Sequence, residues 1–354
     1  MSAFTRSSFA LIVVTLAAAC GGDGPSAPPT TELTPEATAR QYLDVALNAM
    51  QDSSYYRLRI DWTAVRAAAH AQAAGATTYA ATYPAIRTAL AALGDRHGAL
   101  QPPPASGASA DRASVAAHPA DSLDGEVLGG RYGYLRIPTF RTSSYDVQLS
   151  TAFADTLQGL VRAVDNSAPC GWVVDLRHNL GGDMYAMLTG VGPVLGAASP
   201  VGSFIDSKSA IINWWYNDGA TGLADSFGNT YPYERVSGAA YVLRAQSPPV
   251  AVLTDSLTAN SGEAVVVAFR GRPSARSFGA ATFGVPTALR GVKLADGATL
   301  VFTTLLFRDR TGRSYDAPIA PDEPVAQSGA PATDDATVAA ATAWLATQAS
   351  CTGQ

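Results

Sequence analysis

The placement of short apolar runs between helix-patterned segments, from residue 130 onwards, is the feature that most constrains the fold of this chain. The runs that we predict as strands are 132–140, 172–177, 241–244, 250–254 and 299–307. The segments that we predict as helices are 148–164, 184–195, about 261–269, and a last helix that Thr333 caps, with Asp334 and Asp335 at its positive end. Strands that alternate with helices indicate an α/β domain in which helices pack on a sheet. We therefore expect one such domain over residues 130–354.

Two segments of different character precede that domain. Residues 34–100 place apolar side chains at helical spacing, which predicts an N-terminal helical domain. Residues 101–129 are rich in Pro, Ala, Ser and Asp, which predicts a loop or linker between the two parts.

The composition excludes several classes of function. A net charge of −5 and a pI near 5.4 argue against a nucleic-acid partner, because phosphate binding needs clustered positive charge. The chain lacks the P-loop, HExxH and paired CxxC motifs, so we predict no metal and no cofactor. It contains only two lysines, Lys208 and Lys293, and four histidines. Since hydrolytic mechanisms need a titratable base, few residues are candidates for that role.

The first 33 residues indicate export. Residues 1–19 combine a basic start, an apolar stretch too short to span a bilayer and the small residues Ala17, Ala18 and Ala19, which is typical of a signal peptide. Cys20 then opens a Gly- and Pro-rich stretch to residue 33, which resembles a lipidated cysteine with a flexible tether. The alternative is an ordinary cleaved signal, because Ala17 stands where lipoproteins usually carry Leu. With lipidation the chain is anchored in the bacterial cell envelope, facing the periplasm or the exterior.

Export changes the interpretation of the other two cysteines. Cys170 precedes a buried apolar run, and Cys351 lies near the end of the chain. In an oxidising compartment the pair can form a disulfide that pins the C-terminal helix to the sheet. Two free thiols are the alternative.

The segment from Leu253 to Ala264 is the first that could carry chemistry. An apolar strand ends, a loop of small residues turns, and an apolar helix starts. A hydroxyl at such a helix start lies near backbone N–H groups and the positive end of the helix dipole, which stabilise an oxyanion. The alternative is a capping box, with Asn260 at the N-cap and Glu263 three residues later.

Two further segments are candidates. A buried strand ends in Asp175 and Arg177, and the pair Gly181-Gly182 then opens a helix, so that backbone N–H groups can point into a site. The alternative is a plain turn before a helix. His97, after Asp95 and before a glycine, is a candidate general base, although a single histidine of this kind is more often a surface or capping residue. For the other histidines of the helical segment and the loop, His70 and His118, we expect no catalytic role.

In this order the three segments resemble the S41 family of serine peptidases, the tail-specific or C-terminal processing proteases. The resemblance rests on the strand 134–138, on Asp175-Leu176-Arg177 with the following double glycine, and on Thr258 to Glu263. It implies an α/β fold with a crotonase/ClpP-like ββα core and an N-terminal helical cap. The likeness is strongest to the nisin-resistance-protein branch, which carries a D-x-H loop and a segment similar to Gly181–Leu188.

The spacing of the motifs favours that branch. About 33 residues separate Gly98 from Arg131, too few for the PDZ domain that many family members carry there. The processing branch uses a Ser–Lys dyad, but Val285 stands at the position of the lysine. The resemblance therefore implies a Ser–His dyad, with His97 at the position of the histidine.

One departure from the family pattern concerns the nucleophile. The family places its serine three residues before the Glu of the motif, and here Asn260 stands there, followed by Ser261. At a helix start one residue corresponds to about 100° of rotation, which changes the aim of a hydroxyl. Either Ser261 attacks, or the chain has lost hydrolysis and keeps Asn260 as a cap.

The sequence thus predicts an exported serine endopeptidase that cleaves extended peptides or protein C-terminal segments. Ser261 is the nucleophile and His97 the base, while Gly181, Gly182 and the serine turn hold the oxyanion. We assign supporting roles to Asn260, Glu263, Asp175 and Arg177. The alternative hypothesis is a catalytically inactive lipoprotein that binds peptides in the same cleft.

Overall fold

The computed structural model describes residues 33–104, 122–141, 146–326 and 335–352. The chain from Pro35 onwards forms one compact unit. The predicted signal peptide, Cys20 and the tether as far as residue 32 lie outside the described residues, as do His118 and Thr333. No helix of the described part is long and apolar enough to cross a membrane.

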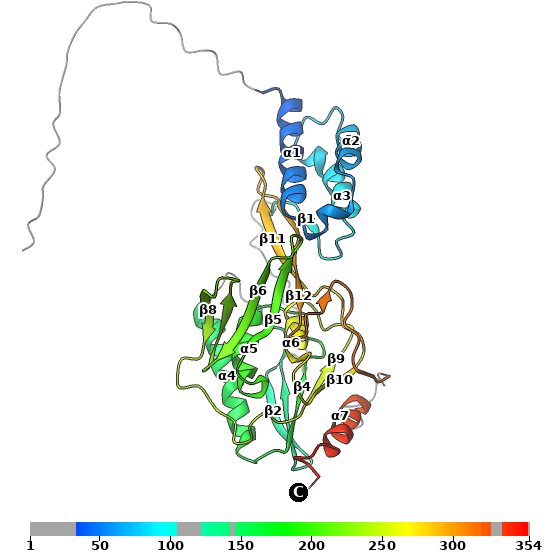
Figure 1. Ribbon diagram of the computed structural model, residues 1–354. Helices are drawn as coiled ribbons and strands as arrows, with labels where there is room; N and C mark the ends of the chain where they lie inside the picture. The colour runs from blue at the N-terminus through cyan, green and yellow to red at the C-terminus, as the bar shows by residue number, and fades with distance from the viewer. Residues whose placement is uncertain (1–32, 105–121, 142–145, 327–334, 353–354) are drawn as a thin grey trace, which may run out of the picture. The chain divides into compact units, whose positions relative to one another are not determined.

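Helices form the N-terminal part of the unit (Figure 1). They are α1 (Pro35–Ser53), η1 (Tyr55–Arg59), α2 (Trp62–Gln72), η2 (Ala80–Thr82) and α3 (Tyr83–Ala92). Asp61 caps α2 through its carboxylate, which accepts the N–H groups of Thr63 and Ala64. The loop after α3 carries Asp95 and His97 and leads into β1 (Ala99–Gln101).

A mostly parallel sheet forms the centre of the α/β part. Its order is β14-β10-β9-β4-β3-β2, and only β2 and β3 pair antiparallel. The strands are β2 (Asp124–Leu128), β3 (Tyr132–Arg136), β4 (Gly171–Asp175), β9 (Val250–Thr254), β10 (Ala275–Gly279) and β14 (Glu323–Pro324). The central strands β4 and β9 are buried along their whole length, as expected for parallel strands covered on both faces.

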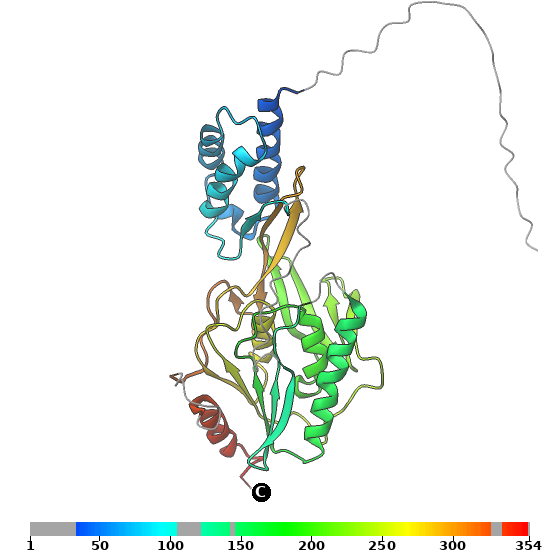
Figure 2. The ribbon, with the colours of Figure 1, turned by 180° about the vertical axis from the view of Figure 1, so that it is seen from behind.

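Helices cover the two faces of this sheet unequally (Figures 1 and 2). Alternate residues of β4 and β9 belong to two different cores, because successive side chains of a strand point to opposite faces. Val174 and Val252 pack in a core with α4 (Val147–Asp165), α5 (Met184–Leu195) and α6 (Ser261–Phe269). On the other face, Val173 and Ala251 pack with the C-terminal helix α7 (Ala336–Ala346).

The second sheet is antiparallel and has the order β1-β12-β5-β6-β7-β8, with β11 and β13 also paired to β12. Its further strands are β5 (Ala198–Asp206), β6 (Ile211–Asn217), β7 (Ala220–Ala224), β8 (Thr230–Arg235), β11 (Thr287–Lys293), β12 (Thr299–Arg308) and β13 (Ser314–Tyr315). Phe204 and Trp214 of this sheet join the core that contains α4, α5 and α6.

The hairpin β11–β12 connects this second sheet to the N-terminal helices. Leu294, Leu300 and Phe302 share one core with α1, α3 and η1. At the hairpin turn, the carboxylate of Asp296 accepts hydrogen bonds from the hydroxyls of Tyr42 and Tyr83. The helical segment therefore has no core separate from the hairpin.

Several predictions of local structure need correction. Residues 241–244 are not a strand, because side chains of α4 bind their backbone: Gln158 accepts the N–H of Tyr241, and Asp165 accepts that of Arg244. The segment 101–129, expected as a loop, contains β2. Asp335 rather than Thr333 is the N-cap of α7, since its carboxylate accepts the N–H groups of the first turn.

The structure joins Cys170, just before β4, to Cys351, just after α7, in a disulfide that spans 181 residues. A cross-link that closes a loop of this length restricts the unfolded chain and stabilises the fold by about 5 kcal/mol in the chain-entropy account. We expect the double variant Cys170→Ser/Cys351→Ser to lose stability of this order in equilibrium urea unfolding. Wild type measured in reductant serves as the matched control, and equal stability of all three samples would contradict the expectation.

Candidate active site

A cleft of about 640 Å³ brings together the predicted base and the predicted nucleophile loop. It lies where the loop after α3, the loop before α5, the start of α6 and the strands β5, β11 and β12 meet. The residues that line it are His97, Arg141, Leu180, Gly182, Asp183, Met184, Tyr185, Phe204, Asn260, Ser261, Thr287, Ala288, Leu289 and Phe307. Segments more than 150 residues apart in the sequence thus build one site.

The turn between β9 and α6 holds Asn260 in an unusual backbone conformation. Its φ of 47° and ψ of −109° lie outside the regions that residues with side chains normally adopt. Glu263 supports this turn from within, because its Oε2 accepts the N–H of Asn260 at 2.8 Å, as the predicted capping box requires. Strain of this kind persists only where the surrounding contacts impose it.

Glu263 is completely buried and acts as an acceptor for two loops. Its carboxylate also accepts the N–H groups of Gly284 and Val285 and the hydroxyl of Thr282. Burial raises the pKa of Glu263, while these hydrogen bonds oppose that shift. Val285 stands where the processing branch is expected to carry its lysine. It donates only its backbone N–H, which the carboxylate of Glu263 accepts.

Ser261 is the first residue of α6, and its hydroxyl is engaged. Its Oγ donates to the carbonyl oxygen of Gly182 at 2.6 Å and lies 3.3 Å from Oδ1 of Asn260. The carboxamide of Asn260 is fixed at its other end, where Nδ2 donates to the carbonyl oxygen of Thr287 at 2.9 Å. Asn260 thus lies between the hydroxyl of Ser261 and the strand that contacts His97.

The two residues of the double glycine are held by different contacts. Gly182 has a φ of 129°, and a Cβ there would lie 1.7 Å from the carbonyl oxygen of Phe140, so no other residue fits without a shift of the backbone. Gly181 donates its N–H to Oδ1 of the buried Asn179 at 2.8 Å. Among the described residues, the N–H of Gly182 has no acceptor, whereas that of Gly181 is engaged by Asn179.

His97 is held by a series of polar contacts that runs away from the cleft. Its Nδ1 lies 3.0 Å from Oγ1 of Thr287, which lies 3.3 Å from Oγ1 of Thr303. The hydroxyl of Thr303 donates to Oδ1 of Asp95 at 2.8 Å. Burial lowers the pKa of His97, and the negative charge of Asp95 opposes the shift. The imidazole is therefore neutral at physiological pH, which is the state that a general base needs.

Asp175 and Arg177, predicted as supporting residues, are not among the residues that line the cleft. Asp175 lies at the end of β4, where its carboxylate accepts the hydroxyl of Tyr134 and pairs with Arg177. Arg177 also pairs with Asp335, the cap of α7. The structure places both in a network that fastens α7 to the sheet. In the described residues no group of three His, Cys, Asp or Glu side chains is arranged to hold a metal ion.

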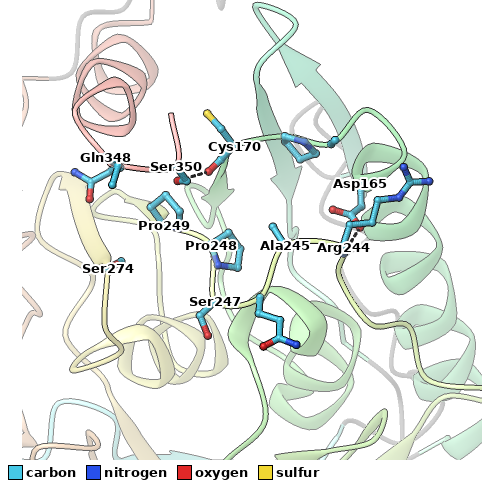
Figure 3. Close-up of a pocket in the computed structure, with 14 residues that line it drawn as sticks. Asp165, Cys170, Arg244, Ala245, Ser247, Pro248, Pro249, Ser274, Gln348 and Ser350 are labelled. Atoms are coloured by element: carbon cyan, nitrogen blue, oxygen red, sulfur yellow. Dashed lines mark hydrogen bonds between the residues drawn. The ribbon is translucent and has the colours of Figure 1, made fainter. Parts of the chain in front are cut away.

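A second hollow, of about 440 Å³, lies at the opposite ends of β4 and β9 (Figure 3). Two of its polar groups bind within the chain: Ser350 donates to the carbonyl oxygen of Cys170, and the backbone N–H of Arg244 donates to Asp165. The guanidinium of Arg244 donates to Asn166. This hollow presents no set of groups comparable to that of the cleft, so we assign it no function.

Comparison with solved structures finds chains of similar fold. A lipoprotein from Streptococcus agalactiae has a TM-score of 0.63 at 20% identity, over 87% of this chain and 96% of that one. The photosystem II D1 C-terminal processing protease has a TM-score of 0.53 at 17% identity, over 81% and 93%. These likenesses confirm the predicted α/β class with an N-terminal helical part.

The sequence comparisons are more specific. The nisin-resistance protein of Lactococcus lactis subsp. lactis is 27% identical over 286 residues, which cover 80% of this chain and 82% of that protein. Residues 131–325 match the profile of peptidase family S41, and this chain belongs to that family. The resemblance predicted from the motifs is thereby confirmed.

Proposed function

We propose that this chain is an exported serine endopeptidase of the S41 family that hydrolyses extended peptides or protein C-terminal segments, with Ser261 as nucleophile and His97 as base. The observation that carries the proposal is the series of contacts from Asp95 to His97. It holds the ring of His97, which burial keeps neutral, at the wall of the cleft that Ser261 also lines. A base held in this manner is the central requirement of a serine mechanism without lysine.

In the proposed reaction, the hydroxyl of Ser261 first leaves the carbonyl oxygen of Gly182. Its proton passes to His97 as Oγ attacks the carbonyl carbon of the substrate, and the N–H of Gly182 stabilises the oxyanion. The C–N bond then breaks, and His97 returns the proton to the departing amine. A water molecule, deprotonated by His97, then attacks the acyl carbon, and the ester bond to Ser261 breaks as His97 gives that proton to Oγ.

The shape and lining of the cleft support a peptide substrate. Thr287, Ala288 and Leu289 of β11 line it and pair with β12 on one side, so an extended peptide can lie along the strand. Phe204 and Phe307 supply an apolar surface for a substrate side chain, and Arg141 is a cation beside it.

The proposed test is to incubate the mature chain with nisin and with a mixture of unstructured peptides. Cleavage products identified by mass spectrometry support the proposal, and no product at any pH between about 5 and 9 overturns it.

A second candidate function follows from Asn260. A carboxamide is not a nucleophile, and it occupies the strained position at the start of α6, while the hydroxyl of Ser261 is bound to Gly182. The corresponding function is peptide binding without hydrolysis. Saturable peptide binding by calorimetry, together with no cleavage, supports this second function and excludes the first.

The proposed mechanism predicts a particular pH dependence. Protonated His97 cannot accept the proton of Ser261, so kcat/KM falls as the pH drops through the pKa of His97. Because burial lowers that pKa, the acid limb of the profile is expected below the ordinary histidine value of 6.5. The measurement is a profile of kcat/KM against pH with one peptide substrate. An acid limb centred above 6.5 would contradict a buried histidine as the base.

The proposed location rests on Cys20, which we infer to carry a lipid that anchors the chain to the cell envelope. Expressed in a bacterium, the wild-type chain is expected in the membrane fraction. Cys20→Ala is expected to be exported but released from the membrane. Equal membrane association of both forms would contradict the lipid anchor.

A further inference from the structure

Arg141 places a positive charge in the cleft, and no carboxylate of the described residues pairs with it. The side chain is exposed, and its hydrogen bond within the described chain runs from Nη2 to the carbonyl oxygen of Leu180 at 3.2 Å. The acidic residue of the lining, Asp183, is engaged elsewhere: its Oδ1 caps α5, and its Oδ2 accepts the hydroxyl of Ser150. Since His97 is neutral, the charge of Arg141 is not balanced by the other lining residues.

The backbone fixes Arg141 beside the loop that carries the proposed oxyanion donor. Phe140 forms a parallel bridge with Gly182 and donates its N–H to the carbonyl oxygen of Gly181 at 3.2 Å. Arg141 follows directly, and a Cβ on Gly182 would lie 3.1 Å from its backbone nitrogen. The carbonyl oxygen of Gly182 in turn accepts the hydroxyl of Ser261. Arg141 is therefore tied through Phe140 to the loop that contacts the proposed nucleophile.

A guanidinium with free donors in a cleft of this kind is suited to a carboxylate. It carries five N–H donors in a planar fork, and the fork binds both oxygens of a carboxylate at once. The contact with Leu180, two residues before Gly182, leaves most of these donors free. An extended peptide advances about 3.5 Å per residue, so a carboxylate bound at Arg141 lies a few residues from a carbonyl group bound at Gly182.

We propose that Arg141 is a specificity-determining residue, which binds a carboxylate of the substrate peptide a few residues from the bond to be cleaved. The consequence for cleavage rests on the proposed function, whereas the binding of the carboxylate applies equally to a chain that binds peptides without hydrolysis. The carboxylate is either the C-terminus of the peptide or an Asp or Glu side chain. In both cases Arg141 contributes to binding and not to the chemical step, so its loss is expected to raise KM and leave kcat nearly unchanged.

Arg141 also supports the loop, because its hydrogen bond to Leu180 holds the two segments together. Loss of this support would lower the rate on every peptide by the same factor. Loss of carboxylate binding instead changes the ratio between peptides with and without a carboxylate. That ratio is therefore the readout, and Arg141→Gln is the main variant.

Two further variants sharpen the comparison. Arg141→Lys keeps the charge but loses the planar fork, so it is expected to keep only part of the preference. Arg96→Gln is the matched control. Arg96 is an exposed cation next to His97 in the chain, but it does not line the cleft, and its guanidinium contacts the carbonyl oxygen of Phe283.

The probes are versions of one short peptide of Ala, Leu and Gln: the free acid, the C-terminal amide, and amides with Glu in place of each residue in turn. Their kcat and KM are measured with the mature chain in low-salt buffer, because salt screens exposed charges. Their dissociation constants are measured by calorimetry with Ser261→Ala. We expect kcat/KM and affinity to be about 10-fold higher for the free acid, or for one Glu amide, than for the plain amide. Arg96→Gln is expected to keep this ratio, and Arg141→Gln to reduce it to about one.

Each outcome decides between the readings. A preference for the free acid assigns the C-terminal carboxylate, and a preference for one Glu amide assigns a side chain. Equal values for all peptides, no binding of any peptide, or a preference that survives Arg141→Gln would overturn the proposal. If Ser261→Ala binds with the expected preference but wild type cleaves no peptide, the role of Arg141 stands and the proposed peptidase function fails. Cleavage of all probes at equal rates gives the reverse result.

Discussion

Ser261→Ala is expected to abolish peptide hydrolysis, and His97→Ala to reduce kcat by about 10⁴-fold or more. The two residues act in one step, because the hydroxyl becomes a nucleophile only as its proton leaves for the imidazole. The double variant is therefore expected to be no worse than Ser261→Ala alone. Initial rates with one peptide, at enzyme concentrations that exclude a contaminating protease, measure all three.

The control for these variants is Ser256→Ala. Ser256 lies on the same loop as Asn260 but is exposed and does not line the cleft. It is expected to keep the wild-type rate. Thermal unfolding of each variant verifies that it is folded and as stable as the wild type. Wild-type rates in Ser261→Ala would contradict the assignment of the nucleophile.

Asn260→Ser is expected to raise the rate of hydrolysis. It places a hydroxyl at the strained position at the start of α6, where the family carries its nucleophile, next to the strand that contacts His97. A misplacement of about 1 Å costs on the order of 10²-fold in rate, so correcting the aim of the hydroxyl should recover a factor of that size. The measurement compares kcat/KM of Asn260→Ser and wild type on the same peptide.

The double variant Asn260→Ser/Ser261→Ala separates the two hydroxyls. If the new serine acts from position 260, this variant keeps the raised rate and still requires His97. Asn260→Ala is the matched control, because it removes the carboxamide without adding a hydroxyl. A rate for Asn260→Ser at or below that of Asn260→Ala would show that the turn does not aim position 260 at the base.

The sequence was informative where a local pattern sets the local structure. The interval between Asn260 and Glu263 predicted a cap that the structure contains. The buried runs of β4 and β9 were recognisable because central parallel strands are apolar throughout. These features depend on residues close together in the chain.

Other features depend on distant partners and left no local signal. Residues 241–244 have the composition of a strand, but Gln158 and Asp165 of α4 bind their backbone. The antiparallel strands between 198 and 235 were not predicted. Thr287 and Thr303 contact His97 and Asp95 across about 200 residues, so nothing around either threonine indicates its partner.

The most direct test of the account is to locate a covalent adduct. The mature wild-type chain is treated with a fluorophosphonate, which reacts with activated serine hydroxyls, and the modified residue is identified by mass spectrometry of peptides. The account predicts one adduct, on Ser261, absent from Ser261→Ala and from His97→Ala. A well-folded wild type without an adduct, or with an adduct elsewhere, would contradict the claim that Ser261 and His97 form the catalytic pair.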